Sequence, residues 1–73
     1  MNEWVTVDPN ICSGKATIRG TRIMVKDILG MIAGGYSLDQ VLQAYPDLTR
    51  EMVDAALQYT VTVIDEEKVL AHA

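Results

Sequence analysis

Short segments in the N-terminal third of the chain alternate between apolar and polar residues, which is the pattern of half-buried β-strands. Residues 4–7 are rich in strand-forming residue types and end at Asp8-Pro9-Asn10, a sequence typical of a turn. Residues 16–19 and 22–25 flank Gly20-Thr21, and glycine at the first position of a two-residue loop suits a type II′ turn. The pattern predicts an edge strand and a small hairpin. It leaves open whether the strands pair within one chain or across a dimer.

From Val25 onward the apolar residues recur with helical spacing instead. One face of this first helix is formed by Val25, Ile28, Leu29 and Ile32. The double glycine Gly34-Gly35 follows, and glycine is the residue that most often ends a helix. The spacing therefore predicts a first helix from about Val25 to the double glycine.

A second, short helix is predicted by a start signal and a stop signal. Ser37 is followed three residues later by Gln40, which is the spacing of a capping box. Pro46 disfavours the helical conformation at Tyr45, so this helix should end near Ala44.

A third and longest helix is predicted after Thr49, which is an N-cap residue type with Glu51 in the first turn. Its apolar stripe is formed by Val53, Ala56, Leu57, Thr60 and Ile64. Residues 60–64 are all β-branched and would also suit a strand. We expect a helix, because the stripe continues through them and residues 65–68 contain no helix breaker.

These elements predict a mainly α fold within a single domain. A β arm or hairpin (residues 1–25) precedes a three-helix, homeodomain-like helix-turn-helix unit (residues 26–73). Of the 73 residues, 49% are apolar, yet a chain this short buries only about 60% of its unfolded surface alone. We therefore expect a homodimer.

Charge is distributed unevenly between the two halves of the chain. Residues 1–36 carry four basic and three acidic side chains, a net charge of +1, whereas residues 37–73 carry two basic and seven acidic ones, a net charge of −5. No acidic residue interrupts the basic residues between Lys15 and Lys26. A polyanion could dock on this segment, although four basic side chains can equally form an ordinary solvated face.

The order helix, helix, turn, helix is shared by DNA-binding helix-turn-helix units and by bundles that bind no nucleic acid. The third helix makes a poor recognition helix, because its outward residues would include Glu51 and Asp54, and acidic side chains oppose a phosphate backbone. The basic arm would therefore supply most of the contacts. The candidate DNA-binding residues are Lys15, Arg19, Thr21, Arg22, Lys26 and Arg50.

The residues needed for catalysis or metal binding do not occur together in this sequence. Cys12 and His72 are the only cysteine and histidine and lie sixty positions apart, so neither a disulfide nor a Cys/His zinc site can form within one chain. Gly14-Lys15 lacks the rest of a phosphate-binding loop, with Pro9 and Ala16 at the required positions. We expect no enzymatic activity, no cofactor and no metal.

The N-terminus has neither the basic segment nor the apolar segment of a secretory signal. No apolar run approaches the roughly 18 residues of a membrane helix. We therefore expect a cytoplasmic protein with no membrane partner.

Two further features indicate contacts with other proteins. Asp65, Glu66 and Glu67 are consecutive and form either a solvated helix face or a contact surface for a basic protein partner. Trp4 could anchor a partner, but on a short strand we expect it in the core or in a dimer interface.

Residues 8–23, DPNICSGKATIRGTRI, carry a resemblance to a known family, supported by shorter matches at 28–29, 33–34, 36–37, 45–46, 48–49 and 55–57. The chain resembles domain-of-unknown-function family 433 from about Val5 to Tyr59. The family's pattern is matched here by Gly14, Lys15, Arg19, Gly20, Thr21 and Arg22. The family commonly has glycine at position 13 and proline at positions 16 and 24, so Ser13, Ala16 and Met24 depart from it in ways that concern the rigidity of the hairpin.

The resemblance implies a small prokaryotic protein with a helix-turn-helix-like fold, encoded beside a PIN-like ribonuclease and acting as its antitoxin in a type II toxin-antitoxin pair. On this interpretation the basic segment binds operator DNA, and Asp65, Glu66 and Glu67 bind the cognate ribonuclease toxin. Two alternatives stay open from the residues themselves: a stand-alone helix-turn-helix DNA-binding regulator, and a dimeric adaptor module that binds no DNA.

Overall fold

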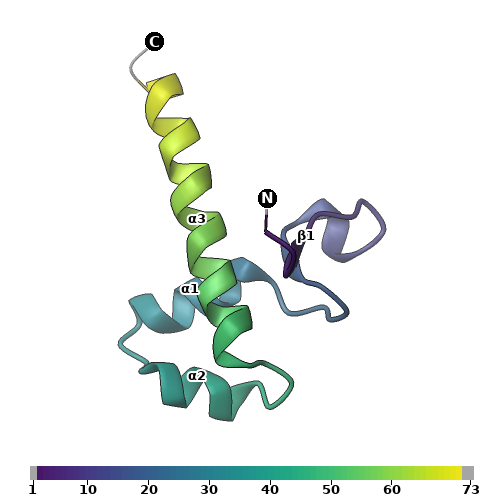
Figure 1. Cartoon of the computed structure of the whole chain (residues 1–73), viewed down its shortest axis with the longest axis vertical. Coiled ribbons are helices and arrows are strands. Elements are labelled where there is room, and N and C mark those ends of the chain that lie inside the picture. Colours follow the sequence, from purple (N-terminus) through teal and green to yellow (C-terminus); the bar gives the residue numbers. More distant parts are fainter. Residues whose placement is uncertain (1, 72–73) are drawn as a thin grey trace.

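The computed structural model describes residues 2–71, and the side chains of residues 2–66. The elements along the chain are β1 (Val5–Thr6), a single turn of 3-10 helix η1 (Cys12–Gly14), β2 (Thr17–Ile18), α1 (Val25–Ala33), α2 (Leu38–Ala44) and α3 (Arg50–Ala71). A short β arm precedes a three-helix unit, so the predicted mainly α fold class is confirmed (Figure 1).

The β arm differs in detail from the predicted hairpin. β1 pairs antiparallel with β2, with Val5 opposite Ile18, so the two strands pair within one chain. The expected second hairpin strand, residues 22–25, is reduced to a single bridge between Thr17 and Met24. The reason is that the Val25 N–H bonds to the Ala16 carbonyl at 3.0 Å while Val25 begins α1, so the chain leaves the sheet there.

The turn of the arm is also of a different type from the one predicted. It spans residues 18–21 and is closed by the Thr21 N–H, which donates to the Ile18 carbonyl at 3.0 Å. Gly20 therefore occupies the third turn position, with φ +79°. A positive φ at the third position is typical of a type II turn, so the predicted type II′ turn is wrong.

The three helices begin, and the first two end, where their local signals predict. α1 ends at Ala33, before Gly34. The capping box is formed: the Gln40 N–H donates to Ser37 Oγ at 3.2 Å, and the Ser37 N–H donates to Gln40 Oε1 at 2.8 Å. α3 runs through residues 60–64, which confirms the helix over the strand. Within this stretch the Thr60 and Thr62 hydroxyls donate to carbonyls four residues earlier, an arrangement open to threonine in a helix.

One hydrophobic core joins the arm to the helices. It is formed by Val5, Ile18, Val25, Ile28, Val41, Leu48, Val53 and Ala56. The Asn2 side chain fastens the N-terminal segment to α3, because its Nδ2 donates to the Ala55 carbonyl at 2.7 Å and its Oδ1 accepts from the Trp4 and Val5 N–H groups.

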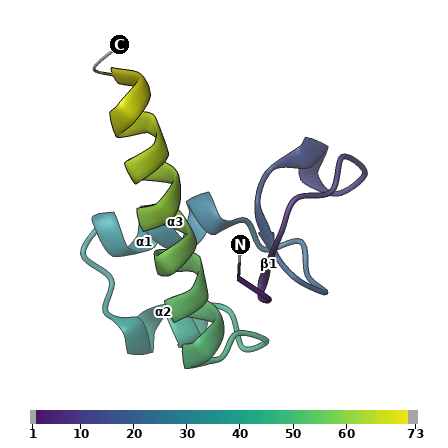
Figure 2. The ribbon, with the colours of Figure 1, turned by 45° about the horizontal axis from the view of Figure 1, so that its top comes forward.

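α3 is longer than the core that it packs against. Its predicted stripe is buried at Val53 and Ala56, but Ile64 is 56% exposed. Figures 1 and 2 show the far part of α3 projecting beyond α1 and α2, with the β arm to one side. The stripe therefore continues past the end of the core. Within the described residues, no helix combines the length and the hydropathy needed to span a bilayer.

Candidate nucleic-acid interface

Four basic residues are displayed on the arm and the start of α1. Lys15 follows η1, Arg19 and Arg22 lie on either side of the Gly20-Thr21 pair, and Lys26 is in the first turn of α1. All four side chains are exposed, as a polyanion-binding surface requires. We call these four residues the basic segment.

Arg19 is the member of this segment with the most defined surroundings. Its guanidinium lies 4.9 Å from the centroid of the Trp4 ring, within the range of a cation–π interaction. Its N–H also donates to the Trp4 carbonyl at 2.7 Å. Trp4 is half-buried beneath this arginine and does not belong to the hydrophobic core, so the first of its two expected places is wrong. Its place in a dimer interface stays a prediction. The contact with the Trp4 ring restricts the orientation of Arg19 without neutralising its charge.

Thr21 has an observed role in building the turn. Its hydroxyl donates to the Ile18 carbonyl at 2.8 Å and accepts from the Ile23 N–H at 3.0 Å. These bonds hold the turn that carries Arg19 and Arg22. A direct contact between Thr21 and DNA stays a prediction.

The loop before Lys15 adopts an unusual backbone conformation. Cys12, Ser13 and Gly14 have successive positive φ values of 50°, 58° and 81°. The left-handed region costs a residue with a side chain about 1–2 kcal/mol. Glycine at position 13 would suit this backbone. The Cys12 Sγ, 3.6 Å from the Arg22 carbonyl, bridges the loop to the turn.

Arg50 is exposed but lies apart from the basic segment. It begins α3, whereas Lys15 and Lys26 share a groove with Thr60. Arg50 and Thr60 are ten residues apart on α3, which corresponds to about 15 Å along the helix axis. The outward residues Glu51 and Asp54 are exposed beside Arg50, as predicted, so this part of α3 presents mixed charge.

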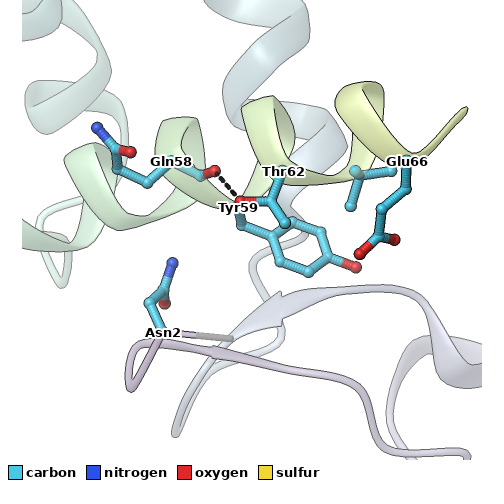
Figure 3. Close-up of a pocket in the computed structure, with 6 residues that line it drawn as sticks. Asn2, Gln58, Tyr59, Thr62 and Glu66 are labelled. Atoms are coloured by element: carbon cyan, nitrogen blue, oxygen red, sulfur yellow. Dashed lines mark hydrogen bonds between the residues drawn. The ribbon is translucent and has the colours of Figure 1, made fainter. Parts of the chain in front are cut away.

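The far part of α3 borders two hollows that the sequence pattern did not reveal. One groove, of about 350 Å³, lies between α3, α1 and the arm and is lined by Lys15, Ala16, Val25, Lys26, Leu29, Tyr59, Thr60, Val63 and Ile64. A second cleft, of about 400 Å³, is lined by Asn2, Gln58, Tyr59, Thr62, Val63 and Glu66 (Figure 3). The one feature of the sequence that could have indicated these hollows is the apolar pair at 63–64, which lies beyond the residues of α3 that form the core.

The predicted partner-binding residues lie on this same part of α3. Asp65 and Glu66 are exposed. In Figure 3 the Glu66 carboxylate and the Tyr59 hydroxyl point to the same side of α3. The side chain of Glu67 lies outside the described residues. Among the residues whose side chains are described, no group of three or more histidine, cysteine, aspartate or glutamate side chains is placed to hold a metal ion.

Sequence and structure comparisons relate this chain to proteins of the same fold. A family model described as "Protein of unknown function (DUF433)" matches residues 5–60. The uncharacterized protein y4eO of Sinorhizobium fredii is 39% identical over 57 residues, which are 78% of this chain and 26% of that protein. This chain thus spans about a quarter of the length of that curated relative.

A crystal structure of a DUF433 member protein from Anabaena variabilis matches with a TM-score of 0.81 and 30% identity over 93% of this chain and 68% of that one. The basic segment falls inside the region that matches the family model, whereas Asp65 and Glu66 lie beyond it.

Proposed function

This chain belongs to the DUF433 family, and from that premise we propose that it is the antitoxin of a type II toxin-antitoxin pair. It binds and neutralises a ribonuclease toxin of the PIN-like type, and it binds its own operator DNA through the basic segment. The antitoxin role comes from the resemblance of the motif at residues 8–23, and the distribution of charge in the structure supports it.

The separation of charge between the arm and α3 is the observation that carries this proposal. The exposed basic side chains of the arm face solvent with no intervening acidic residue in the sequence from Lys15 to Lys26. Exposed acidic side chains lie along α3. The last two of them whose side chains are described, Asp65 and Glu66, lie on the part of the helix that projects beyond the core. One small chain can therefore bind two partners of opposite charge on separate surfaces.

The DNA-binding part of the proposal rests on the two arginines of the turn. Arginine binds phosphate and guanine edges through a planar fork of donors. The ring of Trp4 beneath Arg19 restricts this fork before DNA is bound, which lowers the entropy lost on binding.

The toxin-binding part of the proposal rests on the far part of α3. A nuclease that binds nucleic acid presents a basic surface, and an exposed acidic helix is complementary to it. Glu66 is the better placed acid, because it lines a cleft with Tyr59 and Gln58 that a partner side chain could enter.

The experiment is co-expression of the tagged chain with the open reading frame next to its gene, followed by light scattering and mass spectrometry of the eluted complex. We expect a stoichiometric complex with a ribonuclease that is toxic alone. Glu66→Lys should slow association at low ionic strength by about tenfold, since steering by charge changes on-rates by 10–10³. Glu51→Lys makes the same charge change on the same helix, outside the proposed surface, and should leave association unchanged.

Each other outcome contradicts the antitoxin function. A folded protein that elutes without the ribonuclease and does not relieve the toxicity of that ribonuclease would contradict the antitoxin function. Tight binding to one operator in the absence of a protein partner would then indicate a stand-alone DNA-binding regulator. Weak binding that salt abolishes would indicate the adaptor module.

A further inference from the structure

The turn after β2 projects from the molecule and presents two arginine side chains. Figures 1 and 2 show this turn, drawn in blue, projecting from the arm on the side away from the three helices. Ile18 is fully buried, Thr21 is half-buried, and Gly20 has no side chain. The exposed side chains are those of Arg19, within the turn, and Arg22, directly after it. The tip is therefore a narrow reversal of the chain that displays two guanidinium groups.

The space around this tip is open and carries no negative charge in the sequence nearby. A Cβ atom built on Gly20 would meet no atom within 4 Å. The hollow beside the turn has a volume of about 330 Å³, and its lining residues, Ile11, Gly20, Thr21 and Arg22, include no acidic side chain. A negatively charged surface can therefore approach the tip closely without meeting a like charge in this hollow.

The tip is held in shape by bonds within the arm. The Thr21 hydroxyl crosses the turn, donating to the Ile18 carbonyl at 2.8 Å and accepting from the Ile23 N–H at 3.0 Å. The backbone of Arg19 is fixed to Trp4, because its N–H donates to the Trp4 carbonyl at 2.7 Å. The turn thus keeps its narrow form before any partner is bound, which lowers the entropy lost on binding.

The two grooves of duplex DNA differ in the protein element that fits them. The major groove is about 12 Å wide and admits an α-helix, whereas the minor groove is about 6 Å wide. The start of α3 is a poor element for the major groove, because Glu51 and Asp54 are exposed there. A projecting turn without bulky side chains at its tip suits the narrower groove. Arginine is also the residue attracted by the enhanced negative potential of a narrow minor groove.

We propose that residues 19–22 enter the minor groove of duplex DNA, where Arg19 and Arg22 select A·T-rich sequence. A·T pairs present only acceptors in this groove, which suits the donors of a guanidinium group, whereas G·C pairs add the amino group of guanine. This inference rests on the proposed binding of DNA through the basic segment. It adds the groove that is bound and the base composition that is preferred.

The experiment is fluorescence anisotropy of the full chain with three duplexes that differ only in a central tract of A·T, G·C or inosine·cytosine pairs. Inosine lacks the amino group of guanine, so its pair with cytosine resembles A·T in the minor groove and G·C in the major groove. We expect the A·T and inosine·cytosine duplexes to be bound with similar affinity. Each should be bound about tenfold more tightly than the G·C duplex.

Arg19→Lys separates selection in the groove from simple attraction by charge. The variant keeps the charge, so the salt dependence should stay unchanged. It replaces a planar, weakly hydrated guanidinium with a strongly hydrated ammonium, so the preference for A·T over G·C should fall at least about threefold. Arg50→Lys is the matched control: it makes the same change on an exposed residue outside the arm and should alter neither quantity.

The outcomes distinguish this inference from the proposed function beneath it. An absence of binding to all three duplexes would contradict the DNA-binding part of the proposed function, and this inference with it. Equal, salt-dependent affinity for the three would indicate contacts with phosphates alone. An inosine·cytosine duplex bound as weakly as the G·C duplex would indicate the major groove. These last two results, or a full preference for A·T in Arg19→Lys, would overturn the minor-groove proposal and leave DNA binding intact.

Discussion

Gly20 shows how a single residue positions the candidate DNA-binding side chains. Its φ of +79° is required by the third position of the turn, and a Cβ atom built there would meet no atom within 4 Å. A larger residue would therefore be opposed by the backbone conformation and not by neighbouring atoms. Because Arg19 lies in this turn and Arg22 directly follows it, the geometry of the turn decides where their charges are presented.

We expect Gly20→Ala to lower the free energy of unfolding by about 1–2 kcal/mol, the cost of a left-handed conformation for a residue with a side chain. Gly30→Ala is the matched control: Gly30 lies in α1, where an added Cβ also meets no atom within 4 Å. There alanine should raise stability by up to about 1 kcal/mol. Urea denaturation measures both, and a shift of the same sign in the two variants would contradict this account of the turn.

The helices depend on local signals, whereas the β arm depends on contacts between distant segments. α2 is only seven residues long, and the capping box satisfies the N–H groups of Ser37 and Gln40 at its start. Every residue in that signal lies within one turn of the next, so the sequence predicts it. The hairpin prediction failed because strand alternation at 22–25 competed with helix formation from Val25, and packing of Val25 in the core favoured the helix.

We expect Ser37→Ala to lower stability by about 1 kcal/mol, the usual loss for removal of an N-cap side chain. Gln43→Ala is the comparison within α2: Gln43 is exposed and outside the capping box, and alanine favours helix, so stability should stay unchanged or rise slightly. Thermal unfolding followed by circular dichroism distinguishes the two. Equal losses would show that the capping box contributes nothing to α2.

At the scale of the whole molecule, the main feature is that α3 extends beyond the hydrophobic core that it packs against. The chain measures 41 × 30 × 19 Å, an elongated shape for a single small domain. The projecting part of α3 separates the acidic residues at positions 65 and 66 from the core and leaves Val61 and Ile64 exposed. The net charge of −4 does not reveal this arrangement, because it sums a slightly basic N-terminal half and a strongly acidic C-terminal half.

We expect operator binding to weaken with salt although the protein is acidic overall. Each neutralised phosphate contributes about 0.9 to the slope of log affinity against log salt, so replacing Arg19 and Arg22 by alanine should reduce the slope by about 1.8 per chain. Fluorescence anisotropy at several salt concentrations measures it. Arg50→Ala should leave the slope unchanged. An equal reduction of the slope by Arg50→Ala would show that the start of α3 also contacts the DNA. An unchanged slope in the variant that lacks both Arg19 and Arg22 would show that the arm does not contact the DNA.

The sequence by itself determined the order of the three helices, where each begins and the grouping of charge. These features depend on residues within about one helical turn of each other, such as Ser37 with Gln40 or the glycines after Ala33. Only the tertiary structure decided that β1 pairs with β2 across a loop, that Arg19 rests on Trp4, and that Val25 and Leu29 share a groove with Val63 and Ile64. Such contacts require the closure of long loops, and their formation depends on competing partners throughout the chain, which no local pattern records.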